Sequence, residues 1–536
     1  MKDIYKSQQK TFSRRRIFSQ VLISALIVTI VTASAFTFAF ADSGSDGSGS
    51  DQSTAAQSGP SGSAPPEPPD GNGPPQGGPP GDPPSSTPGG QATDISYTAA
   101  TELTEDTNES GKTYTSSQSN EQALLSSGGT SSIDKATITK TGDSDGDDSD
   151  FYGTNAAVLA TDGKLTITNS DITTDGAHAN AVFAIGSGEI NISDSTITTT
   201  SNNSGAVMVT GGGTLTADNV IAKTSGNSSA PIRSDRGGGT MTINGGSYES
   251  NGVGSPVVYS TADITVNDAE MVSNSSEGVV VEGKNSVTLN GVKLTADNNS
   301  LNGQSETYKA IFLYQSMSGD ADEGTANFTA KNSEINVLNG DTIFVTNTTA
   351  EIYLENNTIT NESGDFLRIQ KGAWGNEGSN GGTVTATLSN QKATGDIIVD
   401  SISTLNLTLT NGTILKSAID TDDQAKQVDL TMSADSVLVL TGDTYVDSLT
   451  NETADNSNIY LNGHKLYVNG VETAANEGTY TEEVDTAQSD DAAETEETAA
   501  TESPDYILIC ALGAAAVIAI GAAVLIKKKK NNNSNN

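Results

Sequence analysis

Cysteine and histidine are almost absent from this chain. Among its 536 residues there are one Cys and two His. A single Cys cannot form a disulfide within the chain, and one Cys with two His cannot make an ordinary four-ligand structural zinc site. The sequence therefore excludes a disulfide-rich fold and a Cys/His zinc module.

Aromatic and basic residues are also scarce. Apolar residues make up 34% of the chain and aromatic residues 5%, which is too little for the core of a compact multi-helix enzyme. Lys and Arg number 27 against 67 Asp and Glu, and the formal charge of −40 argues against nucleic acid as a partner. Disorder or a thin, repetitive β architecture remains.

The first 41 residues have the pattern of a secretory signal peptide. Basic residues within the first 16 positions precede an apolar stretch over residues 17 to 40. Ala39 and Ala41 mark a small-residue cleavage site before Asp42. The alternative is an uncleaved membrane helix, because the apolar stretch is long enough to span a bilayer. Either interpretation takes the chain out of the cytoplasm.

The other end of the chain has the pattern of a membrane anchor. Residues 506 to 526 carry no charge, and four lysines follow at 527 to 530. An apolar span flanked by cations is typical of a transmembrane helix whose basic end lies in the cytoplasm. We expect a single-pass protein at the cell surface, with an extracellular N-terminal domain and a cytoplasmic tail over residues 527 to 536.

Two low-complexity segments flank the middle of the chain. Residues 42 to 93 consist largely of Gly, Ser, Pro, Asp and Gln, and predict a disordered linker. Residues 472 to 505 are rich in Ala, Thr and Glu and contain no Lys or Arg, so self-repulsion predicts an extended acidic stalk. The folded domain is therefore expected over residues 94 to 471.

Within that domain the sequence repeats. The anchor positions of the repeat, mostly 21 to 26 residues apart, are Asn169, Asp194, Asn219, Gly245, Asp268, Gly291, Asn332, Asn356, Asn390 and Asn411. Two residues before the anchors lie Ile167, Ile192, Ala217, Ile243, Val266, Leu289, Ala330, Leu354, Leu388 and Leu409, and the positions four before are also apolar. Three residues after the anchors lie Ile172, Ile197, Ala222, Tyr248, Met271, Leu294, Ile335, Ile359, Ala393 and Ile414.

This pattern predicts a stacked coil. Apolar residues at every second position indicate a strand with one buried face. The step of five residues across the anchor breaks that period, and Asn, Asp and Gly tolerate the left-handed backbone that a bend requires. A turn of about 23 residues cannot bury its apolar face alone and must stack on copies of itself. We expect an all-β, right-handed parallel β-helix of about 12 turns.

Several segments resemble a known family. They are Asp-Phe-Tyr-Gly-Thr-Asn-Ala-Ala-Val at 150 to 158, Arg-Ser-Asp-Arg-Gly-Gly-Gly at 233 to 239, Gly-Ser-Pro at 254 to 256, Tyr-Ser-Thr-Ala-Asp-Ile at 259 to 264 and Val-Glu-Gly-Lys-Asn-Ser at 281 to 286. They are similar to large bacterial surface proteins with a pectin-lyase-like β-helix, often described as adhesin-like. The resemblance covers most of residues 95 to 470 and implies a fold and a surface location, without an agreed ligand or catalytic set.

One candidate binding surface is a column of charged and aromatic residues. Arg236, Tyr259 and Glu282 each lie nine residues before an anchor, so they should stack about 4.8 Å apart, with Arg233 and Asp235 beside them. Such a column could form a groove for a sugar or an acidic ligand. Alternatively, it is an ion-pair ladder that closes a turn, and exposed pairs of that kind are common.

Two long inserts mark a second candidate surface. Residues 315 to 324 and 371 to 382 interrupt the same kind of turn, two turns apart on one edge. Trp374 could stack on a sugar ring, with Tyr314, Arg368 and Lys371 nearby, or it could cover an apolar gap.

An acidic segment is a weak candidate for calcium binding. Asp143, Asp145 and Asp147 alternate as calcium ligands do, but no Glu follows at the twelfth position of the loop. An exposed acidic loop is the alternative interpretation, and no other cofactor is indicated.

The function expected from the sequence is binding. We expect a membrane-anchored, extracellular, adhesin-like β-helix that binds a glycan or a host or bacterial surface ligand, without catalysis. Polysaccharide lyases and hydrolases on this scaffold need a calcium-holding carboxylate cluster with a base or paired carboxylates, and neither is evident in the sequence. A lyase or hydrolase and a purely structural spacer remain as alternatives.

Overall fold

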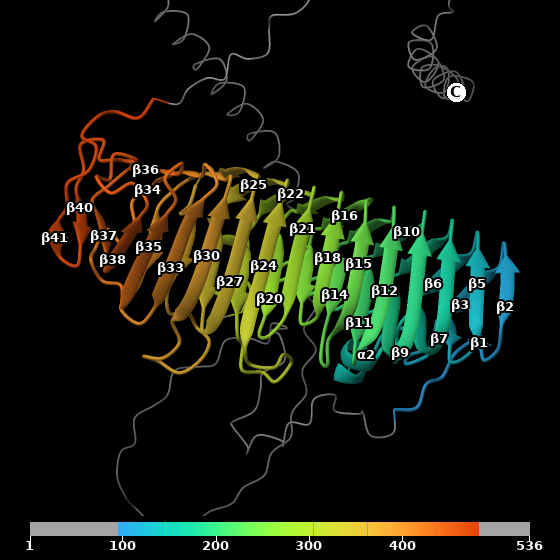
Figure 1. Cartoon of the computed structure of the whole chain (residues 1–536). Coiled ribbons are helices and arrows are strands. Elements are labelled where there is room, and N and C mark those ends of the chain that lie inside the picture. The colour runs from blue at the N-terminus through green and yellow to red at the C-terminus, as the bar shows by residue number, and fades with distance from the viewer. Residues whose placement is uncertain (1–94, 145, 304, 362, 482–536) are drawn as a thin grey trace, which may run out of the picture. The chain divides into compact units, whose positions relative to one another are not determined.

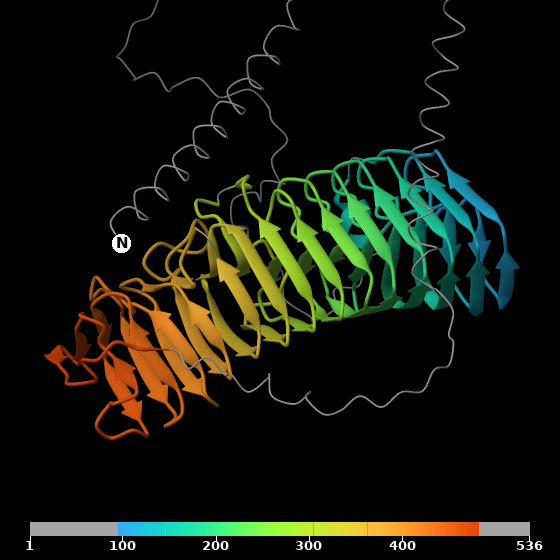
Figure 2. The same cartoon turned by 90° about the horizontal axis from the view of Figure 1, so that it is seen from above.

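The chain forms a right-handed parallel β-helix, as predicted. The computed structural model describes residues 95–144, 146–303, 305–361 and 363–481, and these form about 15 turns with three faces (Figure 1). Seen from above, the turns follow one another along one axis (Figure 2). The predicted number of about 12 turns is too low, because strands as short and polar as Thr107–Ser110 carry no apolar alternation in the sequence.

The first face consists of short strands whose two sides are largely buried. They are β1 (Glu102–Leu103), β4 (Leu124–Ser126), the start of β7 (Val158–Thr168), the start of β9 (Val182–Ser193), β11 (Val207–Thr210), β14 (Ile232–Ser234), β17 (Val258–Ser260), β20 (Val279–Glu282), β23 (Lys309–Tyr314), β26 (Asp341–Thr346), β29 (Leu367–Ile369) and β32 (Ile397–Val399). Strands β7 and β9 run on into the second face, which joins the two faces into one sheet.

The second face is the most regular, and its strands run side by side in Figure 1. Besides the ends of β7 and β9 it contains β2 (Thr107–Ser110), β5 (Thr130–Asp134), β12 (Gly213–Asp218), β15 (Gly239–Asn244), β18 (Asp263–Asn267), β21 (Ser286–Asn290), β24 (Thr325–Lys331), β27 (Thr348–Glu355), β30 (Gly382–Ser389), β33 (Thr404–Thr410), β35 (Gln427–Met432) and β38 (Ser448–Asn451). Buried and half-exposed residues alternate along these strands, as expected for a face with one side in the core.

The third face closes each turn and consists of two parallel sheets. The longer sheet contains β3 (Thr113–Ser116), β6 (Thr137–Lys140), β8 (Asp171–Thr174), β10 (Thr196–Thr199), β13 (Ile221–Thr224), β16 (Ser247–Ser250), β19 (Glu270–Ser273), β22 (Lys293–Asp297), β25 (Glu334–Asn339) and β28 (Thr358–Asn361). The shorter sheet contains β31 (Lys392–Thr394), β34 (Ile414–Ser417), β36 (Val437–Leu440) and β39 (Ile459–Tyr460).

The bend between the second and third faces lies at the predicted anchors. All ten have positive φ angles, from 47° at Asp194 to 64° at Gly245 and Gly291. Their side chains also pair between turns: the amide of Asn219 donates to Asp194 at 2.8 Å, and that of Asn356 donates to Asn332 at 2.7 Å. The anchors therefore form one ridge along the coil, as the repeat predicts.

The core is filled by columns of equivalent residues. Strand pairing places Ile167 beside Ile192 and Ile192 beside Ala217, and the same register continues through the predicted column before the anchors. One predicted core position is wrong: Ala393 pairs with Leu415, and Ile414 is half-exposed. The bend at Asn411 includes one more residue than its neighbours, which shifts the next strand by one position.

The described chain continues past residue 471. After β37 (Thr444–Val446) and β40 (Leu466–Val468), strand β41 (Val471–Glu472) pairs antiparallel with β40, and Asn476 bridges to Tyr460. The start of the predicted stalk therefore lies against the last turns. The predicted signal peptide, the linker over residues 42 to 93, the rest of the stalk, the membrane span and the tail lie outside the described residues.

Helix is almost absent from the described residues. Helix α2 (Asp147–Tyr152) interrupts the coil between β6 and β7 and ends at Gly153 in a left-handed conformation. No helix in this part of the chain is long and apolar enough to cross a membrane.

Candidate functional site

The outward side of the first face carries most of the predicted binding residues. Strand pairing joins six outward-facing residues into one column: Arg233, Tyr259, Val280, Phe312, Phe344 and Arg368. Helix α2 and the two predicted inserts lie next to this side of the coil. The column is the frame on which the candidate site is built.

The predicted stacking of Arg236, Tyr259 and Glu282 in one column is wrong. Arg236 lies beyond the end of β14, whereas Tyr259 lies within β17 and pairs with Arg233. Residues 234–238 connect Arg233 to β15, but only residues 260–262 connect Tyr259 to β18. Because these connections differ in length from turn to turn, residues at the same distance before their anchors do not occupy equivalent positions on the first face.

Arg233 and Asp235 form a buried ion pair. The Nη2 atom of Arg233 lies 2.9 Å from Oδ2 of Asp235, and Nη1 donates to the carbonyl of Ser228. Burial raises the pKa of Asp235 to about 6, although the Arg233 guanidinium opposes the shift. Each charge therefore has its partner within the protein, which agrees with the interpretation of this cluster as an ion pair.

Arg236 joins two segments that lie far apart in the sequence. Its Nε atom lies 2.6 Å from Oδ1 of Asp320 in the first insert, residues 315–324. Its guanidinium carbon lies 3.8 Å from the ring centroid of Phe151 in α2. The side chain of Arg236 is 43% exposed and connects the helix to the insert.

Glu282 is the centre of a buried hydrogen-bond cluster. Its Oε2 atom accepts hydrogen bonds from the hydroxyls of Tyr314, at 2.9 Å, and Tyr259. Its Oε1 atom accepts from the hydroxyl and the backbone N–H of Ser316, the second at 3.3 Å. Burial raises the pKa of the Glu282 carboxyl, against the effect of these hydrogen bonds. Glu282 thereby holds the start of the first insert against β17 and β23.

Trp374 covers an aromatic cluster on the first face. Its ring centroid lies 5.4 Å from that of Phe312 and 5.1 Å from that of Tyr314, in tilted and edge-on arrangements. Phe312 in turn stacks on Phe344 at 5.5 Å. The second insert, residues 371–381, thus folds back over the outer side of β23, and the geometry agrees with Trp374 as a cover for apolar surface.

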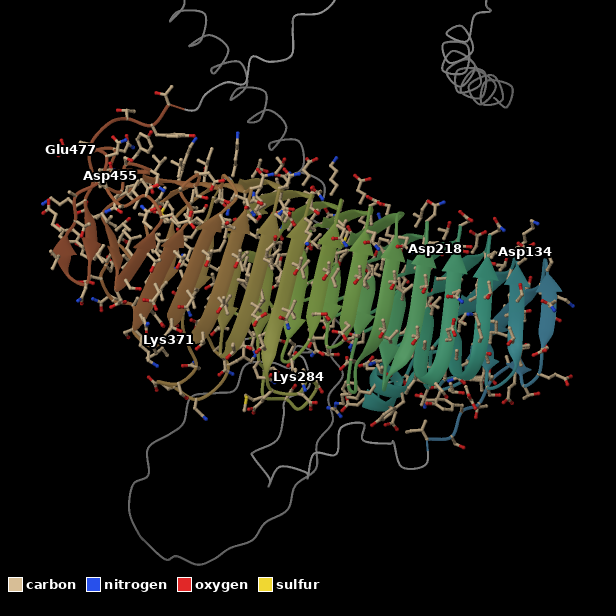
Figure 3. The ribbon with its side chains drawn as sticks, viewed as in Figure 1. Asp134, Asp218, Lys284, Lys371, Asp455 and Glu477 are labelled. Atoms are coloured by element: carbon tan, nitrogen blue, oxygen red, sulfur yellow. The ribbon has the colours of Figure 1, made fainter. Side chains whose placement is uncertain are left out.

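Arg368 is paired with carboxylates of the protein, whereas the side chain of Lys371 is exposed to solvent. The Nε atom of Arg368 lies 2.6 Å from Oδ2 of Asp341, and its Nη2 atom pairs with Asp365. Lys371 is exposed, and among the described residues only its backbone N–H has a partner, Oδ2 of Asp400 at 2.7 Å. Figure 3 shows Lys371 on the same edge of the coil as Lys284, opposite Asp134 and Asp218. Lys371 is therefore available to a ligand.

A polar cavity lies beside the second insert. It has a volume of about 310 Å³ and is lined by Glu306, Lys371, Gly372, Ala373, Gly375, Glu377 and Asn380. Trp374 lies between two of the lining residues but does not line the cavity itself. Of the predicted binding residues, only Lys371 contributes to its wall.

Of the three predicted calcium ligands, Asp145 lies outside the described residues, so calcium binding stays a prediction. Asp143 accepts a hydrogen bond from the N–H of Ala177, and Asp147 begins α2. Within the described ranges, no group of three or more His, Cys, Asp or Glu residues is placed to hold a metal ion.

Several polar residues of this region were not predicted from the sequence. Nδ1 of His178 lies 2.9 Å from Oδ2 of Asp150 in α2, and this contact raises the pKa of His178, although burial opposes the shift. Lys309 is fully buried and lies 3.1 Å from Glu277. Glu377 and Asn380 lie in the second insert, which was the signal that could have indicated them, whereas Glu306 lies in the connection between β22 and β23, which the sequence analysis did not single out.

Comparison of the chain with protein-family models, with curated proteins and with solved structures finds no match.

Proposed function

We propose that this protein is an adhesin-like surface β-helix that binds a glycan or another surface ligand beside the second insert. The observation that supports this proposal is the polar cavity between Glu306 and residues 371–380. Concave sites with a few convergent polar groups are the usual places for small ligands and chain ends to bind.

The residues beneath the cavity suit a rigid binding loop. Trp374 anchors the second insert on Phe312 and Tyr314, and Arg368 is fixed by two carboxylates. In this proposal Trp374, Tyr314 and Arg368 are positioning residues, and Lys371 contacts the ligand. Arg233, Asp235, Tyr259 and Glu282 hold the neighbouring turns and the first insert in place.

The proposed location at a cell surface rests on the sequence. The signal pattern over residues 1 to 41 and the apolar span over residues 506 to 526 support secretion followed by anchoring in the membrane. The acidic stalk would then hold the coil away from the bilayer.

A polysaccharide lyase or hydrolase on the same coil is the second candidate. Asp235, with a pKa raised to about 6, is the carboxyl that favours it, because general acids often have raised pKa values. We prefer binding without catalysis, since Asp235, Glu282 and Asp320 are each engaged by donors of the protein itself.

A glycan array probed with the full chain in detergent tests the proposal. We expect a defined set of glycans to bind, and we expect Lys371→Met to weaken binding several-fold while Lys284→Met, at an exposed lysine on the same edge, leaves it unchanged. Release of unsaturated or newly reducing sugars would support the enzyme instead. Absence of binding to any glycan would leave a structural spacer.

A further inference from the structure

The side chains that line the cavity beside the second insert carry more hydrogen-bond acceptors than free donors. Glu306 and Glu377 are exposed and make no side-chain hydrogen bond or ion pair within the described part of the chain. Lys371 is the one cationic side chain among the lining residues. The wall therefore carries two carboxylates for one ammonium group, and its net charge is negative.

Asn380 adds an acceptor that is not satisfied. Its amide nitrogen donates to the carbonyls of Gly372, at 2.8 Å, and Trp374, at 3.0 Å. Its Oδ1 atom is buried and has no hydrogen-bond partner among the described residues, and the whole residue is only 5% exposed. A buried acceptor without a partner costs about 1–3 kcal/mol, and Asn380 is one of the residues that line the cavity.

This wall suits a ligand that is rich in donors and positively charged. An ammonium group carries three donors and no acceptor, and it is attracted by both carboxylates. A uronate or another anionic sugar would instead face two carboxylates and the acidic surface of the whole chain. Lys371 can still donate to a sugar hydroxyl, so the ligand need not be charged at every position.

We infer that the cavity binds a glycan with free amino groups, such as a polymer of unacetylated amino sugars. The inference rests on the proposed function, because it names the class of glycan for the same site. The carboxylates of Glu306 and Glu377 hold the sugar ammonium, Lys371 contacts a neighbouring hydroxyl, and Asn380 holds the second insert in place through its hydrogen bonds to the carbonyls of Gly372 and Trp374.

Three sets of oligosaccharides of equal length test this inference. Glucosamine, N-acetylglucosamine and galacturonate oligomers are titrated into the full chain in detergent, at a pH at which the amines are protonated. We expect the glucosamine oligomer to bind more tightly than the acetylated one. Glu306→Gln and Glu377→Gln should each weaken its binding by about three- to fivefold, as the loss of one partly exposed ion pair implies.

Glu323→Gln is the matched control, because Glu323 is an exposed glutamate on the first insert, and its change should leave binding the same. Melting temperatures of the variants verify that each still folds. Equal affinity for the amino and the acetylated oligomers, or no effect of either cavity variant, would overturn the inference but leave glycan binding intact. If none of the three oligomers and no glycan of the array bind, the proposed function fails as well.

Discussion

The guanidinium of Arg236 lies 2.6 Å from the carboxylate of Asp320, 84 residues further along the chain. The contact links the connection after β14 to the insert after β23, and it crosses the turns that carry Tyr259 and Glu282. It holds the middle of the first insert, while the hydrogen bonds that Ser316 donates to Glu282 hold its start.

Asp320→Asn should loosen the first insert without unfolding the coil. The pair is partly exposed, so we expect a loss of only about 0.5–1 kcal/mol of stability, and less at high salt. Hydrogen exchange of residues 316–323 should become faster. Asp322→Asn is the control, because Asp322 is exposed and contributes only its backbone carbonyl. Equal exchange in the two variants would show that the ion pair does not hold the insert.

Glu282→Leu should be far more destabilising than Glu282→Gln. The leucine leaves the hydroxyls of Tyr259 and Tyr314 without their shared acceptor, and a buried group without a partner costs about 1–3 kcal/mol. The glutamine keeps one carbonyl oxygen and should cost about 1 kcal/mol. Chemical denaturation measures both changes. Similar losses in the two variants would mean that the hydroxyls find other partners.

The stability contributed by His178 should depend on pH. The hydrogen bond to Asp150 raises the pKa of His178 above 6.5, so the folded state binds the proton more tightly than the unfolded chain. The contribution is complete below pH 6.5 and is lost as the pH rises through the folded pKa. The difference in melting temperature between the wild type and His178→Asn should therefore shrink with rising pH.

Asparagine is the suitable replacement at position 178, because the backbone there has a φ of 55° and asparagine tolerates that conformation. Comparison with the variant also cancels the titration of Asp235, which is present in both proteins. A difference that stays constant across the pH range would contradict the charged pair.

At the bend at Asn219, a residue that has a Cβ atom but no side-chain amide should destabilise the protein. Its φ is 54°, so Asn219→Ala should lower the free energy of unfolding by about 1–2 kcal/mol, whereas Asn219→Gly should lower it by only a few tenths of a kcal/mol. Thermal unfolding measures both changes. If the glycine variant is as unstable as the alanine variant, the loss comes from the hydrogen bond to Asp194 and not from the backbone conformation.

The acidic segment around α2 can be tested by removal of metal. We expect the melting temperature to be the same with calcium and with a chelator, because Asp143 and Asp147 are exposed and the carboxylate of Asp143 already accepts a hydrogen bond from the backbone of Ala177. A melting temperature that falls in chelator would show a bound ion.

The repeat was sufficient to predict the second face and its corner. Ile167 and Asn169 belong to a strand and a bend whose lengths barely vary, so spacing in the sequence equals register in space. The first face was not predictable in the same way, because the connections after Arg233 and Tyr259 differ in length. Each difference changes the spacing between the first-face residue and its anchor, so equal spacing in the sequence does not indicate equivalent positions.

The partners of individual side chains were hidden for another reason. Nothing in the sequence around Arg236 indicates Asp320, and nothing around His178 indicates Asp150, because these pairs form only when inserts fold back over earlier turns. The sequence identified the second insert, but the acceptors of the cavity depend on how Trp374 docks that insert onto the first face.

Each strand of the coil pairs only with the equivalent strands of the turns next to it, and only α2 and the inserts reach further, so the position of the cavity along the coil depends on the number of turns before it. Removal of one whole turn between β9 and β15 would bring the cavity about 4.8 Å closer to the N-terminal end and leave its walls unchanged. The distance that the coil spans and the ligand that its cavity selects are therefore separate properties of this architecture. Evolution could add turns to the coil without changing the residues of the cavity.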